Sequence, residues 1–139
     1  MTATDNLWPE FSLDEVVRSP KTILNEQAEF LAKGTKNLLK GNTTTNLSQD
    51  GCIFYYFEIV APNLSGYKYI LFYIYQKDVF PYPCTLNFNK KEFNILTEDI
   101  LMQKLKDIFN DENTKKVISA LLAQSKDNRS SSQTEWKIY

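Results

Sequence analysis

The chain has 139 residues, of which 42% are hydrophobic and 24% are charged, and its formal net charge is −1. A chain of this length buries a sizeable core without metal or disulfide support, so we expect a single globular domain. The near-neutral charge gives no long-range attraction to phosphate backbones or anionic lipid, and only Arg18 and Arg129 are arginines, so we expect neither a nucleic acid nor a membrane as partner.

The first residues do not have the pattern of a secretion signal. Met1–Leu7 is polar and lacks the basic start and apolar run of a signal peptide, and the longest apolar stretches are strand-length and interrupted by charges. We therefore expect a cytoplasmic protein. In a reducing compartment Cys52 and Cys84 are expected to be two reduced, partly buried thiols rather than a disulfide or a redox pair.

Residues 1–19 are predicted to form an N-terminal arm. Four acidic residues and one arginine make this segment acidic. Ser12–Glu15 has the spacing of a capping box, which predicts a short helical turn. We expect the arm to cover an edge of the core through its apolar side chains, which are Trp8, Phe11, Leu13, Val16 and Val17.

A first helix is predicted from about Pro20 to Lys40. Ser19 can cap its free N–H groups, and Pro20 is tolerated at the first helical position. Apolar residues fall on one half of the helical wheel, so this helix is expected to cover a sheet. Gly41 is expected to end the helix, whereas Gly34, on the apolar side, indicates either close approach to a strand or a break.

The middle of the chain predicts a four-stranded antiparallel sheet with meander topology, because its connections are too short for parallel crossovers. An Asp-Gly turn precedes a hairpin whose loop, Pro62–Gly66, is rich in turn-forming residues. Asn89–Leu96 is expected to be a connector. The four strands are predicted at Asn42–Ser48, Ile53–Ala61, Tyr67–Gln76 and Cys84–Phe88.

Two C-terminal helices complete the expected α+β fold. Thr97 caps the first of them, and acidic residues follow in its first turn, as a helix N-terminus favours. The second is predicted from about Thr114 to Ser125, and both are expected to lie on the same face of the sheet as helix 20–40. The single domain would then span residues 20–125, with the polar residues 126–139 as a flexible C-terminal tail.

The sequence offers no recognisable catalytic or metal-binding pattern. It contains no histidine, which removes the commonest general base, the usual nucleophile triads and most zinc and iron sites. The four glycines are scattered and form no phosphate-binding loop. Adjacent acids at 98–99 and 111–112 are explained by helix starts. We expect no cofactor and no metal, while catalysis by carboxylate, lysine or tyrosine stays open.

Tyrosines mark one face of the predicted sheet as the candidate site. Alternation along the third strand predicts Tyr67, Tyr69, Leu71, Tyr73 and Tyr75 on one side. The other side, with Lys68, Ile70, Phe72 and Ile74, is expected to face the core. The hairpin register is not readable, so the second strand adds either Phe54, Tyr56, Glu58 and Val60 or the set Tyr55, Phe57 and Ile59 to that face. Glu58 is expected on a half-exposed face, although a buried carboxylate with a raised pKa is the alternative.

These patterns favour a non-catalytic protein-protein interaction domain, such as an accessory, adaptor, inhibitor or immunity-type protein. Its tyrosine-rich face is expected to bind another protein or a second copy of the chain. If helices covered both faces of the sheet, this face would be buried and could not bind a partner. A second hypothesis is a small-molecule or peptide-binding fold, with an enzymatic role open, whose pocket lies between the sheet and helix 20–40. The predicted partner-binding residues are Tyr56, Glu58, Tyr67, Tyr69, Tyr73 and Tyr75.

Overall fold

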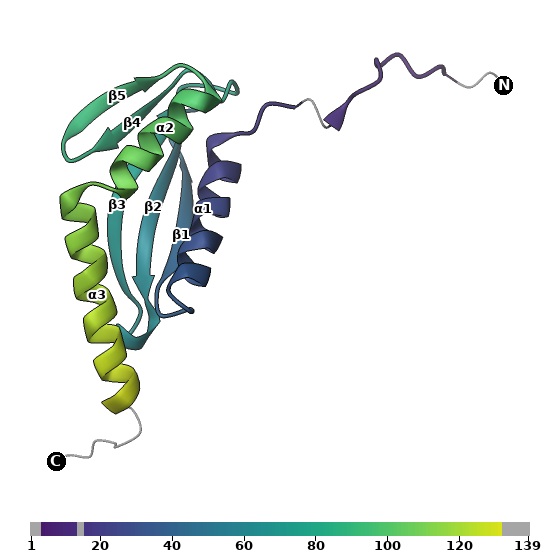
Figure 1. Cartoon of the computed structure of the whole chain (residues 1–139). Coiled ribbons are helices and arrows are strands. Elements are labelled where there is room, and N and C mark those ends of the chain that lie inside the picture. The colour runs from purple at the N-terminus through teal and green to yellow at the C-terminus, as the bar shows by residue number, and fades with distance from the viewer. Residues whose placement is uncertain (1–3, 14–15, 132–139) are drawn as a thin grey trace.

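The computed structural model describes residues 4–13 and 16–131 and is an α+β domain with one antiparallel sheet, as predicted (Figure 1). Five strands follow one another as a meander in the order β1-β2-β3-β4-β5. The elements along the chain are α1 (Pro20–Gly34), β1 (Lys40–Leu47), β2 (Ile53–Ala61), the 3-10 turn η2 (Pro62–Leu64), β3 (Tyr67–Gln76), β4 (Cys84–Phe88), β5 (Lys91–Ile95), α2 (Glu98–Phe109) and α3 (Glu112–Ser131).

Helix α1 starts where the sequence predicts but ends at Gly34 rather than Lys40. The Ser19 hydroxyl accepts a hydrogen bond from the Thr22 N–H at 3.3 Å, and Pro20 occupies the first turn. The helix ends because residues 36 and 37 have positive φ angles of 52° and 67°, which turn the chain back toward the sheet. The Thr35 hydroxyl stabilises this reversal by donating to the Leu31 carbonyl at 2.9 Å.

Gly41 does not end the first helix as expected, and of the two alternatives for Gly34 the break is the one found. Gly41 lies inside β1, where an added Cβ would stand 2.6 Å from both Cα and Cβ of Ala28, so only glycine lets α1 lie this close to the strand. Gly34 would meet no atom within 4 Å if it carried a Cβ. The close approach therefore belongs to Gly41, and Gly34 marks the break in the helix.

The sheet has one strand more than predicted. β2, β3 and β4 have the predicted bounds, whereas β1 begins two residues earlier than expected, and β5 lies within the predicted connector 89–96. Asn89 and Lys90 both have positive φ, at 55° and 64°, and form a two-residue turn. This turn pairs Phe88 directly with Lys91 and so adds β5 to the edge of the sheet.

A β-bulge interrupts the central hairpin. Phe57 pairs with Phe72, but the next residue of β2, Glu58, pairs with Ile70, so Leu71 has no partner. An extra residue in one strand shifts the alternation of side chains on that strand by one position. Odd-numbered residues of β3 therefore face the helices before the bulge and face away from them after it. The sequence predicts one uniform alternation along the strand and does not contain this change.

The C-terminal helix α3 is longer than predicted. Thr97 caps α2 as expected, accepting from the Ile100 N–H at 3.2 Å, but α3 extends to Ser131, through a segment predicted to be the beginning of a flexible tail. Residues 132–139 of that predicted tail lie outside the described residues. Hydrogen bonds hold the end of α3 to the hairpin loop: Asn63 Nδ2 donates to the Ser125 carbonyl at 3.2 Å, and Asn128 Nδ2 donates to the Asn63 carbonyl at 2.9 Å.

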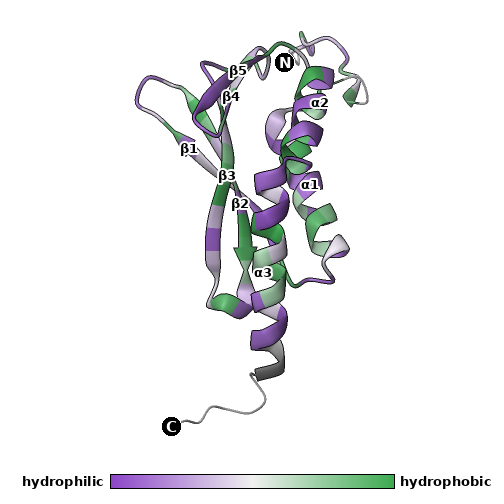
Figure 2. Cartoon of the chain, turned by 60° about the vertical axis from the view of Figure 1, so that its left-hand side comes forward, coloured by the Kyte–Doolittle hydropathy of each residue, from purple (hydrophilic) through white to green (hydrophobic). Residues whose placement is uncertain are grey.

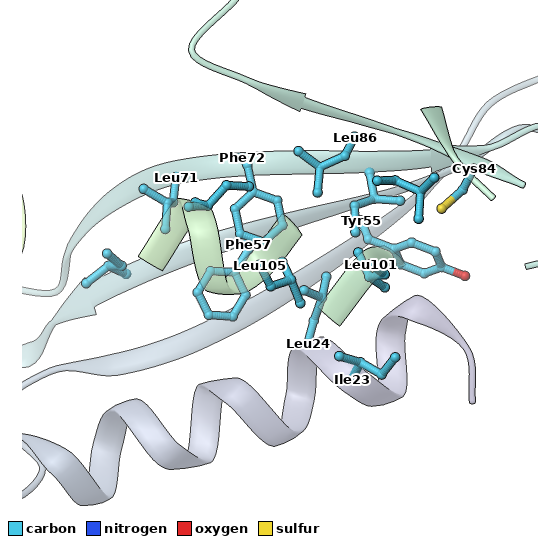
Figure 3. Packing of buried hydrophobic residues seen from close by; sticks show 14 of the residues in the cluster. Ile23, Leu24, Tyr55, Phe57, Leu71, Phe72, Cys84, Leu86, Leu101 and Leu105 are labelled. Carbon is cyan, nitrogen blue, oxygen red and sulfur yellow. The ribbon is translucent and has the colours of Figure 1, made fainter. Parts of the chain in front are cut away.

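All three helices lie on one side of the sheet, as predicted (Figure 2). The core between the layers joins residues from every helix and from β2, β3, β4 and β5. Figure 3 shows Ile23 and Leu24 of α1 directed toward Phe57 and Tyr55, with Leu101 and Leu105 of α2 beside them. Across the described residues, no helix is long and apolar enough to cross a lipid bilayer.

The described residues 4–13 of the N-terminal arm lie away from the domain instead of covering its edge (Figure 1). Arg18 joins the arm to the body by pairing with Glu26 of α1 and Glu98 of α2. The predicted turn at 12–15 cannot be assigned, because residues 14 and 15 lie outside the described residues. The apolar side chains of the arm are exposed, and these are Leu7, Trp8, Phe11, Leu13, Val16 and Val17.

Candidate functional site

The side of the sheet that faces away from the helices carries the candidate site, and we call it the outer sheet face. No helix or strand of residues 4–13 and 16–131 covers it (Figure 2). Strand pairing places the same face of each strand in register. Its central positions are Phe54, Tyr56, Glu58 and Val60 of β2 and Lys68, Ile70, Tyr73 and Tyr75 of β3.

Four rings at the middle of this face form one cluster, the aromatic quartet of Phe54, Tyr56, Tyr73 and Tyr75. The ring centroids of the directly paired residues, Phe54 with Tyr75 and Tyr56 with Tyr73, are each 5.4 Å apart. The diagonal pair Phe54 and Tyr73 is 6.1 Å apart, and the rings of Phe54 and Tyr56 are 6.3 Å apart and nearly parallel. Cross-strand aromatic pairs at such spacings stabilise a hairpin and fix the rings relative to one another.

Glu58 lies beside the quartet and is held by the neighbouring strand. Its Oε1 atom accepts hydrogen bonds from Asn42 Nδ2 at 2.8 Å and from the Thr44 hydroxyl at 3.1 Å. The side chain is half-buried and on the uncovered face, as expected from the sequence. Two donors on one oxygen orient the carboxylate, so its position on the surface is defined before any partner arrives.

Polar side chains surround the quartet on the flanking strands. The face carries Lys40 and Lys68 at one end and two acids, Glu58 and Glu92, so its charges balance. Surfaces with an apolar centre and a polar rim are typical of protein-protein interfaces. The rim on β1, β4 and β5 consists of Asn42, Thr44, Asn46, Thr85, Asn87, Glu92 and Asn94.

The structure brings together four of the six predicted site residues and separates the other two. Tyr56, Glu58, Tyr73 and Tyr75 share the outer sheet face. Tyr67 and Tyr69 lie on the helix side, because they pair with Ala61 and Ile59 beyond the bulge. They line a hollow beside α3 together with Leu64, Val117 and Leu121.

Phe54 is the residue that the predicted site lacks, although it stacks on Tyr75 and belongs to the quartet. Ile70 and Lys68 join the same face only because of the bulge. The loop that pairs Ala61 with Tyr67 would, in an uninterrupted register, pair Phe54 with Ile74 instead of Tyr75. The bulge then changes the register by one residue, and nothing in the local sequence marks it.

Two further titratable groups have raised pKa values because they are wholly or partly buried. Burial raises the pKa of the Cys84 thiol to about 12, so this side chain is a protonated core residue. Burial, and then proximity to Cys84 and Glu98, raises the pKa of the Tyr82 hydroxyl, which donates to the Arg18 carbonyl at 3.0 Å. Both cysteines are free, in keeping with two reduced thiols. Within the described part of the chain no cluster of acidic or cysteine side chains is arranged to hold a metal ion.

A small apolar cavity lies on the other side of the sheet, beneath α1. Its volume is about 220 Å³, whereas sites for drug-sized ligands are about 300–1,000 Å³. We call this cavity the helix-side groove. It is lined by Gln27, Phe30, Leu31, Phe57, Ile59, Leu71, Phe109 and Ile118.

Comparisons of the chain with protein families, with curated proteins and with solved structures each found no match. The candidate site therefore rests on the geometry of the domain. Two features of that geometry bear on function: the uncovered aromatic quartet on one side of the sheet and the helix-side groove on the other.

Proposed function

We propose that this protein is a non-catalytic interaction domain whose outer sheet face binds another protein. The observation that carries the proposal is the aromatic quartet, four contiguous rings on a face that no described element covers. Tyrosine contributes a large contact area at low entropic cost and keeps a hydroxyl for hydrogen bonding, which is why it is enriched at interfaces. Clustered aromatic side chains at the centre of a face are also where binding energy concentrates.

The chemistry around the quartet supports a protein partner over a charged polymer. Equal numbers of lysines and acids on the face give no net attraction for phosphate backbones. Amide and hydroxyl groups on β1, β4 and β5 can instead pair with the mixed donors and acceptors of a protein surface. The oriented Glu58 carboxylate supplies one strong acceptor for a donor of the partner.

A small accessory, adaptor, inhibitor or immunity-type protein fits these features. Such proteins act by covering or connecting a partner, and this needs a preformed surface rather than a reaction centre. The aromatic quartet is preformed, because its rings are already in contact across β2 and β3. A preformed surface binds with less loss of side-chain freedom than one that must be ordered by the partner.

The alternative of a ligand pocket between the sheet and α1 has less support. The helix-side groove has the expected position, but its volume of about 220 Å³ is small for a metabolite-sized ligand, and its lining offers one polar side chain, Gln27. A small-molecule site needs several convergent polar groups to orient its ligand. We therefore prefer the outer sheet face as the functional surface.

The proposal can be tested on a single strand, because β3 presents tyrosines to both sides of the sheet. Tyr73 lies in the quartet, whereas Tyr67, which is 50% exposed, lies on the helix side. Tagged wild-type protein, Tyr73→Glu and Tyr67→Glu are compared in pull-downs from source-cell lysate, with partner amounts measured by quantitative mass spectrometry. We expect a stoichiometric partner with wild type and Tyr67→Glu and at least a ~30-fold weaker interaction with Tyr73→Glu.

Thermal unfolding by circular dichroism must show that both variants fold. A partner that binds Tyr73→Glu as well as wild type contradicts the proposal. A wild-type pull-down that recovers no protein in stoichiometric amount also contradicts the proposal, because the outer sheet face would then have no function in binding.

A further inference from the structure

The N-terminal arm exposes more apolar surface than a free segment in water normally does. Trp8 is 75% exposed and Phe11 is 68% exposed, and their ring centroids are 6.3 Å apart, so two aromatic rings project together from one short stretch. Leu7, Leu13, Val16 and Val17 are exposed as well. Contiguous exposed apolar side chains of this kind mark a surface that another chain covers.

The attachment of the arm directs it away from its own domain (Figure 1). Arg18 is fixed by its ion pair with Glu26, by Glu98, which accepts from its main-chain N–H at 3.2 Å, and by Tyr82, which donates to its carbonyl at 3.0 Å. Phe11 stands seven residues before this anchor, so its side chain can reach about 25 Å beyond the domain. That distance is sufficient to contact a neighbouring copy.

The helix-side groove is a receptor of suitable size for one such ring. Apolar cavities of about 150 Å³ in protein cores bind benzene, and this one measures about 220 Å³. A second, more polar hollow of about 550 Å³ between α1 and α2 adjoins it, and the two share Gln27 and Phe109. Two adjoining hollows match two aromatic side chains that are three residues apart on one segment.

Charge favours the same pairing. Residues 1–17 contain four acids and no base, a charge of −4, whereas residues 18–131 contain 15 basic and 12 acidic residues, a charge of +3. At the groove itself the charges are mixed: Lys106 and Asp99 both line the adjoining hollow. Near Phe30, the exposed Lys33 follows by three residues and Glu26 precedes by four. An acidic, apolar arm therefore meets an apolar groove on a domain of opposite net charge.

We propose that the arm of one copy docks onto a second copy of this chain, with Trp8 and Phe11 inserted into the helix-side groove and the hollow that adjoins it. Reciprocal docking gives a two-fold symmetric dimer, in which each arm fills the groove of its partner. The outer sheet face lies on the opposite side of the sheet and stays free in both copies. The dimer is therefore independent of the proposed function and can fail or hold without it.

Sedimentation velocity and fluorescence of the full chain test the dimer. Trp136→Phe leaves Trp8 as the only tryptophan. We expect a dimer whose dissociation on dilution is accompanied by a red shift of the Trp8 emission, and whose dissociation constant rises with salt concentration. The double variant Trp8→Ala/Phe11→Ala and the groove variant Phe30→Glu should each weaken the dimer at least ~30-fold by sedimentation.

A matched control and a mixing experiment identify the contact. Phe30 is 61% exposed and Phe80, in the loop between β3 and β4, is 66% exposed, so Phe80→Glu makes the same change elsewhere and should leave the dimer intact. The variant Trp136→Phe/Phe30→Glu has an intact arm, and the variant Trp8→Ala/Phe11→Ala has an intact groove. Mixing the two should restore a blue shift of Trp8 and a mixed dimer held by one arm.

Several results would overturn the inference. A dimer that tolerates both the arm and the groove variants uses another surface. A monomer whose Trp8 emission is blue-shifted at every concentration has its arm docked on its own domain. A monomer whose native mass spectrum shows a bound small molecule has a ligand in the groove. A monomer with neither feature does not dock its arm onto a second copy.

Discussion

Replacing Gly41 by alanine tests the packing of the helix layer on the sheet. The new Cβ would lie 2.6 Å from Ala28 Cα and 3.1 Å from Phe57 Cζ, and the Ala28 atom belongs to the helix backbone, which cannot rotate away. Overpacking of this kind costs about 1–3 kcal/mol. Alanine regains about 0.5–1 kcal/mol because it restricts the unfolded chain more than glycine does, so the net loss of unfolding free energy is expected to be about 1–2 kcal/mol.

Urea denaturation followed by circular dichroism measures this loss. With a slope of about 1–3 kcal/mol per molar urea for a domain of this size, the midpoint of Gly41→Ala should fall by about 0.5–1 M. Gly34→Ala is the matched control, because its Cβ would meet nothing within 4 Å and alanine is the better helix former. It should raise the stability by about 0.5 kcal/mol. Equal midpoints for the two variants would refute the close approach of α1 to β1 at Gly41.

Three further predictions concern the thiol, the bulge and a helix cap. Cys84 keeps its proton up to about pH 12 when folded but loses it near pH 9 when unfolded. The unfolding free energy should therefore fall by up to about 1.4 kcal/mol per pH unit above pH 9. The fall in urea midpoint between pH 8 and pH 10 should be smaller for Cys84→Ala than for wild type. Deletion of Leu71 leaves Ile70 opposite Glu58 and Lys68 opposite Val60, but it removes a buried core side chain and should cost at least about 2 kcal/mol in the same assay; unchanged stability would mean that Leu71 has no structural role. Thr97→Ala removes the cap of α2 and should cost about 1 kcal/mol, whereas Thr97→Ser should retain most of the stability.

Local signals in the sequence predict the elements that local chemistry decides. The hairpin strands, β4 and the caps at Ser19 and Thr97 lie where turn formers, β-branched residues and capping side chains indicate. The predicted end of α1 is wrong because the apolar pattern continues through Leu38 and Leu39. These side chains are buried from the loop after the helix and not from the helix itself. Periodicity does not distinguish these two ways of burying a side chain.

Features set by tertiary contacts were not predictable in the same way. β5 is short and polar, and it depends on a turn at Asn89 and Lys90 that contains no glycine. The last turns of α3 are polar, and their hydrogen bonds with Asn63 come from a residue distant in sequence. Extra residues in a strand leave no compositional trace, so the bulge at Leu71 moved Tyr67 and Tyr69 off the predicted face while the other four site residues stayed together.

Site-specific photo-crosslinking in the source cell tests the central claim most directly. A benzophenone amino acid is incorporated at position 73, in the aromatic quartet, or at position 67, on the helix side of the same strand. If the outer sheet face binds a protein, the probe at position 73 should give one dominant crosslink, to a single protein. The probe at position 67 should not give that crosslink. Crosslinking of that protein from position 67 alone, or no crosslink from position 73, would contradict the account.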